Sequence, residues 1–320
     1  MVGEKNRGLE YMFIMMNAAR YSVGLEGVGI AERATQRAVA YARTRLQGTE
    51  IGSGRRDKVA IIRHPDVRRM LLQMKARTEA MRALAVVVAA AMDTAERHAD
   101  PDHRRQSQAF VDLMIPVVKG WCTENGVEIA SLGVQVHGGM GFVEDAGAAQ
   151  HLRDARIMPI YEGTTGIQAN DLVFRKVALD GGESMRVLID SMRDTERQLA
   201  QGCDETLPAL ARRLREGISA LSRATDFVVA EHLGDAPRVA AGAVPFLHLA
   251  GIVTGGWQMA RAGLAAHRCL RDGAPNAPFY RAKLATARFY ADHVLTGAPG
   301  LAETVVDGAQ GILAMEDEGL

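Results

Sequence analysis

Apolar residues recur at spacings of three and four positions along almost the whole chain, which is the period of an amphipathic helix. Alanine, leucine, methionine and arginine, all good helix formers, are plentiful, whereas aromatic residues make up only 5% of the sequence. No segment shows a convincing two-residue alternation of the kind that strands require. The pattern therefore predicts an all-α fold.

The first half of the chain is predicted to form a bundle of four long helices joined by short loops. A Gly-rich segment at 47–54 follows the first helix, and Pro65 suits the first turn of the second. Pro116 is expected to kink the third helix. The expected helices cover about residues 8–46, 65–98, 104–132 and, beyond a short helix at 146–156, the segment up to about 179.

Three glycines lie within the first predicted helix. Gly24, Gly27 and Gly29 interrupt the side-chain pattern of residues 8–46, but no proline does so. We therefore expect one long helix, in which the glycines let another helix approach closely. Two helices with a break near Gly27 are the alternative.

The segment Asp180-Gly181-Gly182-Glu183 marks the strongest predicted boundary, because two adjacent glycines favour a break between helical patterns. We expect one domain at 1–180 and a second at 181–320. The second domain is predicted to be helical at about residues 183–201, 206–233, 242–271 and 278–296, followed by a Gly-rich, acidic tail.

Composition disfavours several classes of function. Lys and Arg total 38, as do Asp and Glu, so no net charge attracts nucleic acid or an anionic membrane. The longest apolar run, 83–92, is far shorter than the roughly 20 residues that cross a bilayer. Residues 2–7 lack the apolar core of a secretory signal, and Cys122, Cys203 and Cys269 show neither metal-binding spacing nor a paired framework. We expect a cytoplasmic protein without metal, nucleic acid or membrane insertion.

A carboxylate lies in a turn between two helical patterns, within residues 153–168 (RDARIMPIYEGTTGIQ). Thr164 is a suitable N-cap for the helix that follows, so Glu162 is expected just outside a helix start, near outward-pointing N–H groups. Such a carboxylate would be oriented. Taken alone, the turn fits a solvated surface glutamate better, but two further motifs change that interpretation.

The chain resembles the flavin-dependent acyl-CoA dehydrogenase family in three motifs that occur in the family's order. Residues 41–48 (YARTRLQG) are similar to its Tyr-Ala-x-x-Arg-x-x-Phe-Gly segment, and residues 135–142 (QVHGGMGF) and 153–168 are the other two. The resemblance covers 1 to about 180 and implies the family's C-terminal four-helix bundle. Residues 182–320 more loosely resemble a second helical domain found in a branch that includes enzymes similar to 3-methylmercaptopropionyl-CoA dehydrogenase.

The resemblance implies the oxidation of an acyl-CoA thioester to a 2-enoyl-CoA. In the family a glutamate removes the proton alpha to the thioester carbonyl while hydride leaves the β carbon for the flavin, and Glu162 matches this general base. Limited hydration beside a bound ligand would raise the pKa of its carboxyl group toward the range useful for proton transfer. Its backbone N–H would bond the thioester oxygen, and Tyr161 and Gly163 would shape the substrate slot.

Some relatives carry their base on the long first helix instead. At the matching position this chain has Ala19, which leaves Glu162 as the base that the resemblance names. The next residue, Arg20, would balance charge near the substrate. A helix arginine paired with solvent or with a neighbouring glutamate is the alternative for Arg20.

FAD is the cofactor that the resemblance implies. It assigns Arg45 to a phosphate, Gln135 to the adenosine part, and Gly138, Gly139 and Thr164 to further contacts. A guanidinium fork suits a phosphate, an amide both donates and accepts, and glycines let backbone approach a ligand. In the family the first two motifs commonly reach the flavin of a neighbouring subunit, which implies an oligomer. As alternatives, Arg45 could interact only with the dipole at the C-terminus of its helix, and Gly138 and Gly139 could form only a connector.

Two positions near the implied cofactor depart from the family pattern. The phenylalanine before Gly48 is missing, so the adenine-facing surface should differ. Gly166 replaces a glutamine that is often used near the flavin, which leaves fewer polar contacts there.

The family's N-terminal helical domain and middle β domain, which precede the segment that matches residues 3–7, have no counterpart in this sequence. They normally hold much of the flavin and close the acyl-CoA cleft. We therefore expect activity only with a partner that carries these domains, or within a longer enzyme, because catalysis needs positioned reactants. A non-catalytic helical interaction protein without flavin is the alternative.

Overall fold

The computed structural model describes residues 3–54, 56–202 and 205–319, and Cys203 lies outside these ranges. Every regular element within them is helical, and the one extended feature is an isolated bridge between Leu46 and Ala60. The all-α prediction is confirmed. The first half contains α1 Gly8–Thr44, α2 Pro65–Arg97, α3 Pro101–His137, α4 Gly139–Phe142, α5 Ala148–Ala155 and α6 Thr165–Asn170, which continues as a π-helical segment, η3, over Asp171–Val177.

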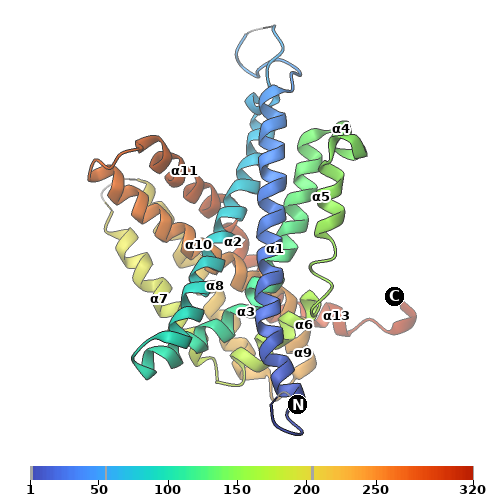
Figure 1. The fold of residues 1–320 in the computed structure, drawn as a ribbon, viewed down its shortest axis with the longest axis vertical. Helices are drawn as coiled ribbons and strands as arrows, with labels where there is room; N and C mark the ends of the chain where they lie inside the picture. Colours follow the sequence, from blue (N-terminus) through green and yellow to red (C-terminus); the bar gives the residue numbers. More distant parts are fainter. Residues whose placement is uncertain (1–2, 55, 203–204, 320) are drawn as a thin grey trace.

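Helix α1 is one continuous helix, as predicted, and it runs through most of the height of the molecule, below the loop that follows it (Figure 1). Two of its glycines allow α3 to approach. A Cβ atom would lie 2.5 Å from Val118 Cγ1 at Gly24 and 2.6 Å from the Cys122 carbonyl oxygen at Gly27. The prediction is wrong for Gly29, where a Cβ would meet nothing within 4 Å, because this glycine lies on the exposed side of the helix.

Helix α3 is longer than the sequence pattern predicts. It begins at Pro101 because the Asp100 side chain caps it, accepting a hydrogen bond from the Asp102 N–H at 2.8 Å, and because proline suits the first turn. It also continues through Pro116 to His137, and the kink expected at this proline stays a prediction.

Within the described residues, the second half is helical at the four predicted positions, and it also contains three short α-helices that the pattern did not predict. The predicted acidic tail is wrong over its first part, where Ala298, Ala302 and Val305 form a buried face of α12 at the spacing of one helical stripe. The helices are α7 Glu183–Ala200, α8 Thr206–Glu231, α9 Ala236–Ala241, α10 Ala243–Arg271, α11 Ala277–His293, α12 Ala298–Asp307 and α13 Ala309–Leu313.

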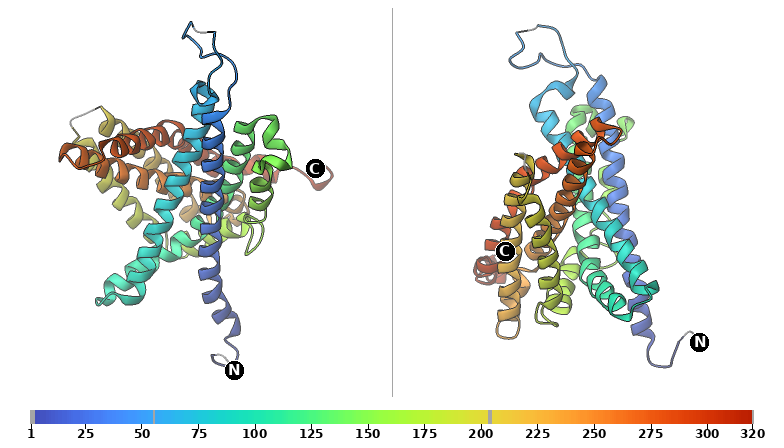
Figure 2. Two further views of the ribbon diagram at one scale, coloured as in Figure 1. Left: turned by 45° about the horizontal axis from the view of Figure 1, so that its top comes forward. Right: turned by 90° about the vertical axis from the view of Figure 1, so that its left-hand side faces the viewer.

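The two halves pack side by side around one continuous set of buried residues. In the right-hand view of Figure 2, α1 lies at one edge and the C-terminus lies toward the opposite edge. Between them, the Trp121 ring of α3 packs against Gly251 and Gly255 of α10, where added Cβ atoms would lie 2.2 and 2.6 Å from ring atoms. The division into domains at 180 stays a prediction. No helix in the described ranges has an apolar stretch long enough to cross a membrane.

Candidate active site

The predicted Glu162 turn joins α5 to α6 and has an unusual backbone. Glu162 has φ 56°, a left-handed conformation that few non-glycine residues adopt, and Gly163 follows with φ 88°. Thr164 is the N-cap of α6, as predicted, since its Oγ1 accepts a hydrogen bond from the Ile167 N–H at 3.3 Å. The chain therefore makes a sharp, capped reversal at the carboxylate.

Two side chains hold the inner side of this turn. The Nζ of Lys119, on α3, donates to the carbonyl oxygens of Met158 at 2.8 Å and Gly163 at 2.7 Å. The Nε2 of Gln168 lies 3.3 Å from the carbonyl oxygens of Glu162 and Gly163. Lys119 is fully buried, and burial lowers its pKa to about 8. Neighbouring charges also act on this pKa, the acidic ones raising it and a basic one lowering it.

The outer side of the turn is free to meet a ligand. Glu162 is half-buried, and no residue in the described ranges donates to its carboxylate or accepts from its backbone N–H. Beside it, the Tyr161 hydroxyl donates to the Glu26 carboxylate of α1. Burial, and then this hydrogen bond, raise the pKa of Tyr161 to about 12. The turn thus presents an unpartnered carboxylate and an unpartnered N–H together.

Arg20 is buried, and it pairs with neither solvent nor a neighbouring glutamate, which were the partners named in the alternative interpretation. Its NH1 atom lies 3.1 Å from Asp171 Oδ2, and both side chains are 9% exposed. Asp171 begins the π-helical segment after α6, so this ion pair joins α1 to the element that follows the turn. The role of Arg20 in binding substrate stays a prediction.

Four of the predicted cofactor residues line one pocket of about 580 Å³. Arg45 and Gln135 are exposed there, and the Tyr41 ring stacks on the His137 ring with centroids 4.4 Å apart. Gly138 and Gly139 complete the group, and a Cβ at either would meet nothing within 4 Å. The pocket is therefore open along its glycine side.

The fifth predicted cofactor residue, Thr164, does not line this pocket. Glu26, which contacts the turn through Tyr161, and Arg45 are 19 residues apart along α1 and its C-cap. At 1.5 Å per residue this separation is roughly 28 Å. The structure therefore divides the predicted residues into the Glu162 turn and a distant group, the Arg45 pocket.

Sequence reasoning missed Lys119 and Glu26. One signal for Lys119 was present: it is a single lysine in an otherwise apolar run that extends from Leu113 to Cys122. The side chain of such a lysine is expected either to extend toward solvent or to donate hydrogen bonds to buried acceptors. Glu26 carried no comparable signal, because its contact depends on a residue 135 positions away.

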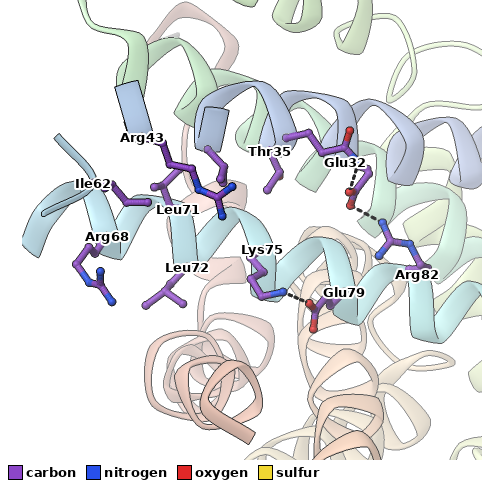
Figure 3. Close-up of a pocket in the computed structure, with 12 residues that line it drawn as sticks. Glu32, Thr35, Arg43, Ile62, Arg68, Leu71, Leu72, Lys75, Glu79 and Arg82 are labelled. Carbon is purple, nitrogen blue, oxygen red and sulfur yellow. Dashed lines mark hydrogen bonds and ion pairs between the residues drawn. The ribbon is translucent and has the colours of Figure 1, made fainter. Parts of the chain in front are cut away.

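A second pocket, of about 440 Å³, lies between α1 and α2 and contains none of the predicted site residues (Figure 3). Charged side chains line it, and several are already paired: Glu32 with Arg82, and Glu79 with Lys75. Elsewhere in the described ranges, no three His, Cys, Asp or Glu residues are grouped in a way that could hold a metal ion.

Comparison with protein families gives two matches that together cover most of the chain. Residues 6–176 match the family described as "Acyl-CoA dehydrogenase, C-terminal domain". Residues 188–316 match the one described as "Acetyl-CoA dehydrogenase C-terminal like".

Two curated relatives match over nearly the whole chain. The 3-methylmercaptopropionyl-CoA dehydrogenase of Ruegeria pomeroyi is 48% identical over 98% of this chain and 53% of its own length. The broad-specificity linear acyl-CoA dehydrogenase FadE5 of Mycobacterium tuberculosis is 33% identical over 92% of this chain and 50% of its own length. The chain thus spans about half the length of these relatives.

Solved structures share the fold. An acyl-CoA dehydrogenase of Bacillus anthracis, complexed with FAD, aligns with a TM-score of 0.72 at 18% identity, over 98% of this chain and 53% of that one. ACDH-11 of Caenorhabditis elegans, in complex with C11-CoA, also gives a TM-score of 0.72, at 19% identity, over 92% of this chain and 45% of that one.

Proposed function

The chain belongs to the acyl-CoA dehydrogenase family, and from this premise we propose that it forms the C-terminal catalytic part of an FAD-dependent enzyme that oxidises an acyl-CoA to a 2-enoyl-CoA. One observation carries the proposal. The Glu162 carboxylate and its N–H are both unpartnered on a turn whose inner side is held by Lys119 and Gln168. A general base and an oxyanion donor need this combination of fixed backbone and free functional groups.

In the proposed reaction Glu162 removes the proton alpha to the thioester carbonyl. The N–H of the same residue donates to the thioester oxygen, where negative charge develops as the proton leaves. Tyr161 and Gly163 flank the base and shape the slot for the acyl group. FAD, when bound, accepts the hydride that leaves the β carbon.

The residues of the Arg45 pocket fit a dinucleotide cofactor. The guanidinium of Arg45 is exposed and has no acidic partner in the described ranges, so it is free to bind a phosphate. The open glycine side allows backbone to approach the ligand. At the turn, the Thr164 hydroxyl accepts from a backbone N–H and still has its own proton to donate to the cofactor.

The separation of the two groups supports an oligomer. We propose that the Glu162 turn serves the flavin of its own active site, whereas the Arg45 pocket, roughly 28 Å away along α1, serves the flavin of a neighbouring subunit. The neighbour is either another copy or a partner that carries the N-terminal and middle domains.

A cytoplasmic location is proposed from the cysteine usage alone.

The test is a chimera that joins this chain to the part of the Ruegeria pomeroyi relative that the match does not cover. We expect a yellow protein that reduces an artificial electron acceptor with 3-methylmercaptopropionyl-CoA or butyryl-CoA. Glu162→Gln should lower turnover by roughly 10²–10⁴-fold and leave the flavin bound, because only the base is lost.

The control is Glu183→Gln, an exposed glutamate in the first turn of α7. It should retain full activity. Full turnover by Glu162→Gln would reject the base assignment, and a colourless assembly that takes up no flavin would reject the proposed function.

A further inference from the structure

Lys119 has a buried charge without a carboxylate partner. Its side chain is 0% exposed, and no Asp or Glu in the described ranges lies within ion-pair distance of it. Its ammonium donates instead to the carbonyl oxygens of Met158 and Gly163. Burying an unpaired charge is unfavourable. The two hydrogen bonds to carbonyl oxygens therefore stabilise the buried ammonium as well as the turn.

These two contacts bridge the segment that carries Glu162. Met158 and Gly163 lie on either side of that residue, so one ammonium draws both ends of the turn toward α3. The contacts of Lys119, at 2.7 and 2.8 Å, are shorter than the 3.3 Å contacts of Gln168. Lys119 therefore contributes the stronger hold, since charge-assisted hydrogen bonds are short and strong.

The same contacts orient peptide groups in the turn. A trans peptide points its N–H away from its C=O. With the carbonyls of Glu162 and Gly163 drawn inward, the N–H groups of the following residues, Gly163 and Thr164, face outward. The left-handed φ of Glu162 belongs to this arrangement, and such a conformation persists only where its surroundings fix it.

We propose that Lys119 is a positioning residue that holds Glu162 in its left-handed conformation and so aims the carboxylate at the substrate. The part that concerns substrate rests on the proposed function. Lys119 does not touch the reacting atoms in this arrangement. It acts through the backbone of the turn.

The first test measures the turn itself. Hydrogen exchange of the peptide that covers residues 157–168 reports on the internal amides of Tyr161 and Thr165, which donate to the carbonyl oxygens of Ile157 and Pro159. Lys119→Met, which keeps the length of the side chain but removes the ammonium, should speed this exchange by at least about tenfold. Lys119→Gln, a neutral donor, should give an intermediate rate and carries the test if the methionine variant does not fold.

Lys75→Met is the matched control, because Lys75 belongs to a partly exposed pair on α2. It should leave exchange in residues 157–168 unchanged. If both Lys119 variants exchanged at the wild-type rate, the proposal would be overturned, whether or not the assembly oxidises acyl-CoA.

The second test uses the chimera described above. Lys119→Met should lower kcat by about 10- to 100-fold with little change in KM or in flavin content, because a misaimed base costs rate rather than binding. Lys119→Gln should recover part of the loss. Faster exchange with an unchanged kcat would overturn the claim that Lys119 aims the base. An inactive wild-type chimera would count against the proposed function, and the exchange measurement would still decide whether Lys119 holds the turn.

Discussion

The Glu162 turn and the Arg45 pocket differ in where their contacts come from. The inner side of the turn is held by two buried side chains, Lys119 on the distant helix α3 and Gln168 six residues beyond Glu162. The pocket lies at the ends of α1 and α3 and the start of α2. It combines buried side chains such as His137 with exposed ones such as Arg45 and Gln135, and on its glycine side an added Cβ would meet nothing within 4 Å. The chain therefore supplies the inner support of the Glu162 turn by itself, whereas the glycine side of the Arg45 pocket stays open.

This difference separates the effects of substitutions in the two regions. A change in the turn should alter the stability of the chain even without ligand. A change in the pocket should leave the chain intact and become visible only when the cofactor is added.

Gly163→Ala should destabilise the chain by about 3 kcal/mol. Its φ of 88° disfavours a side chain, and the new Cβ would lie 2.7 Å from Gln168 Nε2. Urea unfolding gives the free energy. Gly166→Ala is the matched control in the same motif, since a Cβ there would have Thr164 Oγ1 as its neighbour, at 3.8 Å, and alanine favours the helix. Equal stability of the two variants would show that the turn is not fixed from inside.

Arg45→Ala should weaken FAD binding by the assembled enzyme about tenfold, the free energy of one charge-assisted hydrogen bond, about 1.5 kcal/mol. The melting temperature of the chain without cofactor should not change. Arg43→Ala is the control, because Arg43 lies two residues away but lines the pocket of Figure 3. Titration of flavin fluorescence measures both variants, and equal affinities would remove Arg45 from the cofactor site.

Thr164→Ala should destabilise the chain by about 1 kcal/mol, the usual value of an N-cap. Its Oγ1 accepts from the Ile167 N–H, and serine offers the same oxygen. Thr164→Ser should therefore unfold at nearly the wild-type urea concentration. A loss of the same size in both variants would mean that the methyl group, rather than the cap, stabilises this position.

The smallest effect is expected from the Tyr161–Glu26 contact at alkaline pH. The pKa of Tyr161 is raised to about 12, so between pH 10 and 12 the unfolded chain loses this proton while the folded chain keeps it. The contribution to stability falls as pH rises through that window, by less than about 1 kcal/mol because the pair is near solvent. Glu26→Gln should lower the pH midpoint at which Tyr161 ionises. Ultraviolet absorbance measures this ionisation, and the Tyr161→Phe variant identifies the part of the signal that comes from Tyr161.

Much of the fold could be predicted because its signals are local. The Thr164 cap, the proline at the start of α2 and the apolar period of α1 each depend on neighbouring residues. The C-terminal helix α12 was missed because glycines and a proline at its start resemble a tail, although Ala302 and Val305 are buried and the helix packs on α8 and α10.

The candidate site could be predicted only in part, for the same reason. The motif around Glu162 contains the free groups and one of the donors behind them, Gln168, but the other donor, Lys119, lies on α3. Lys119 meets Gly163 across 44 positions, and Arg20 meets Asp171 across 151. No local pattern encodes such pairs, since each joins residues that only the packed fold brings together.

The seating of Trp121 against Gly251 and Gly255 bears on how the protein can be handled. Cutting the chain near residue 181 would expose the Trp121 ring on one piece and the apolar surface around Gly251 and Gly255 on the other. Surfaces of that kind favour aggregation in water. The sequence break between the two halves is thus a poor place for truncation, and expression of the uncut chain is the better route to soluble material.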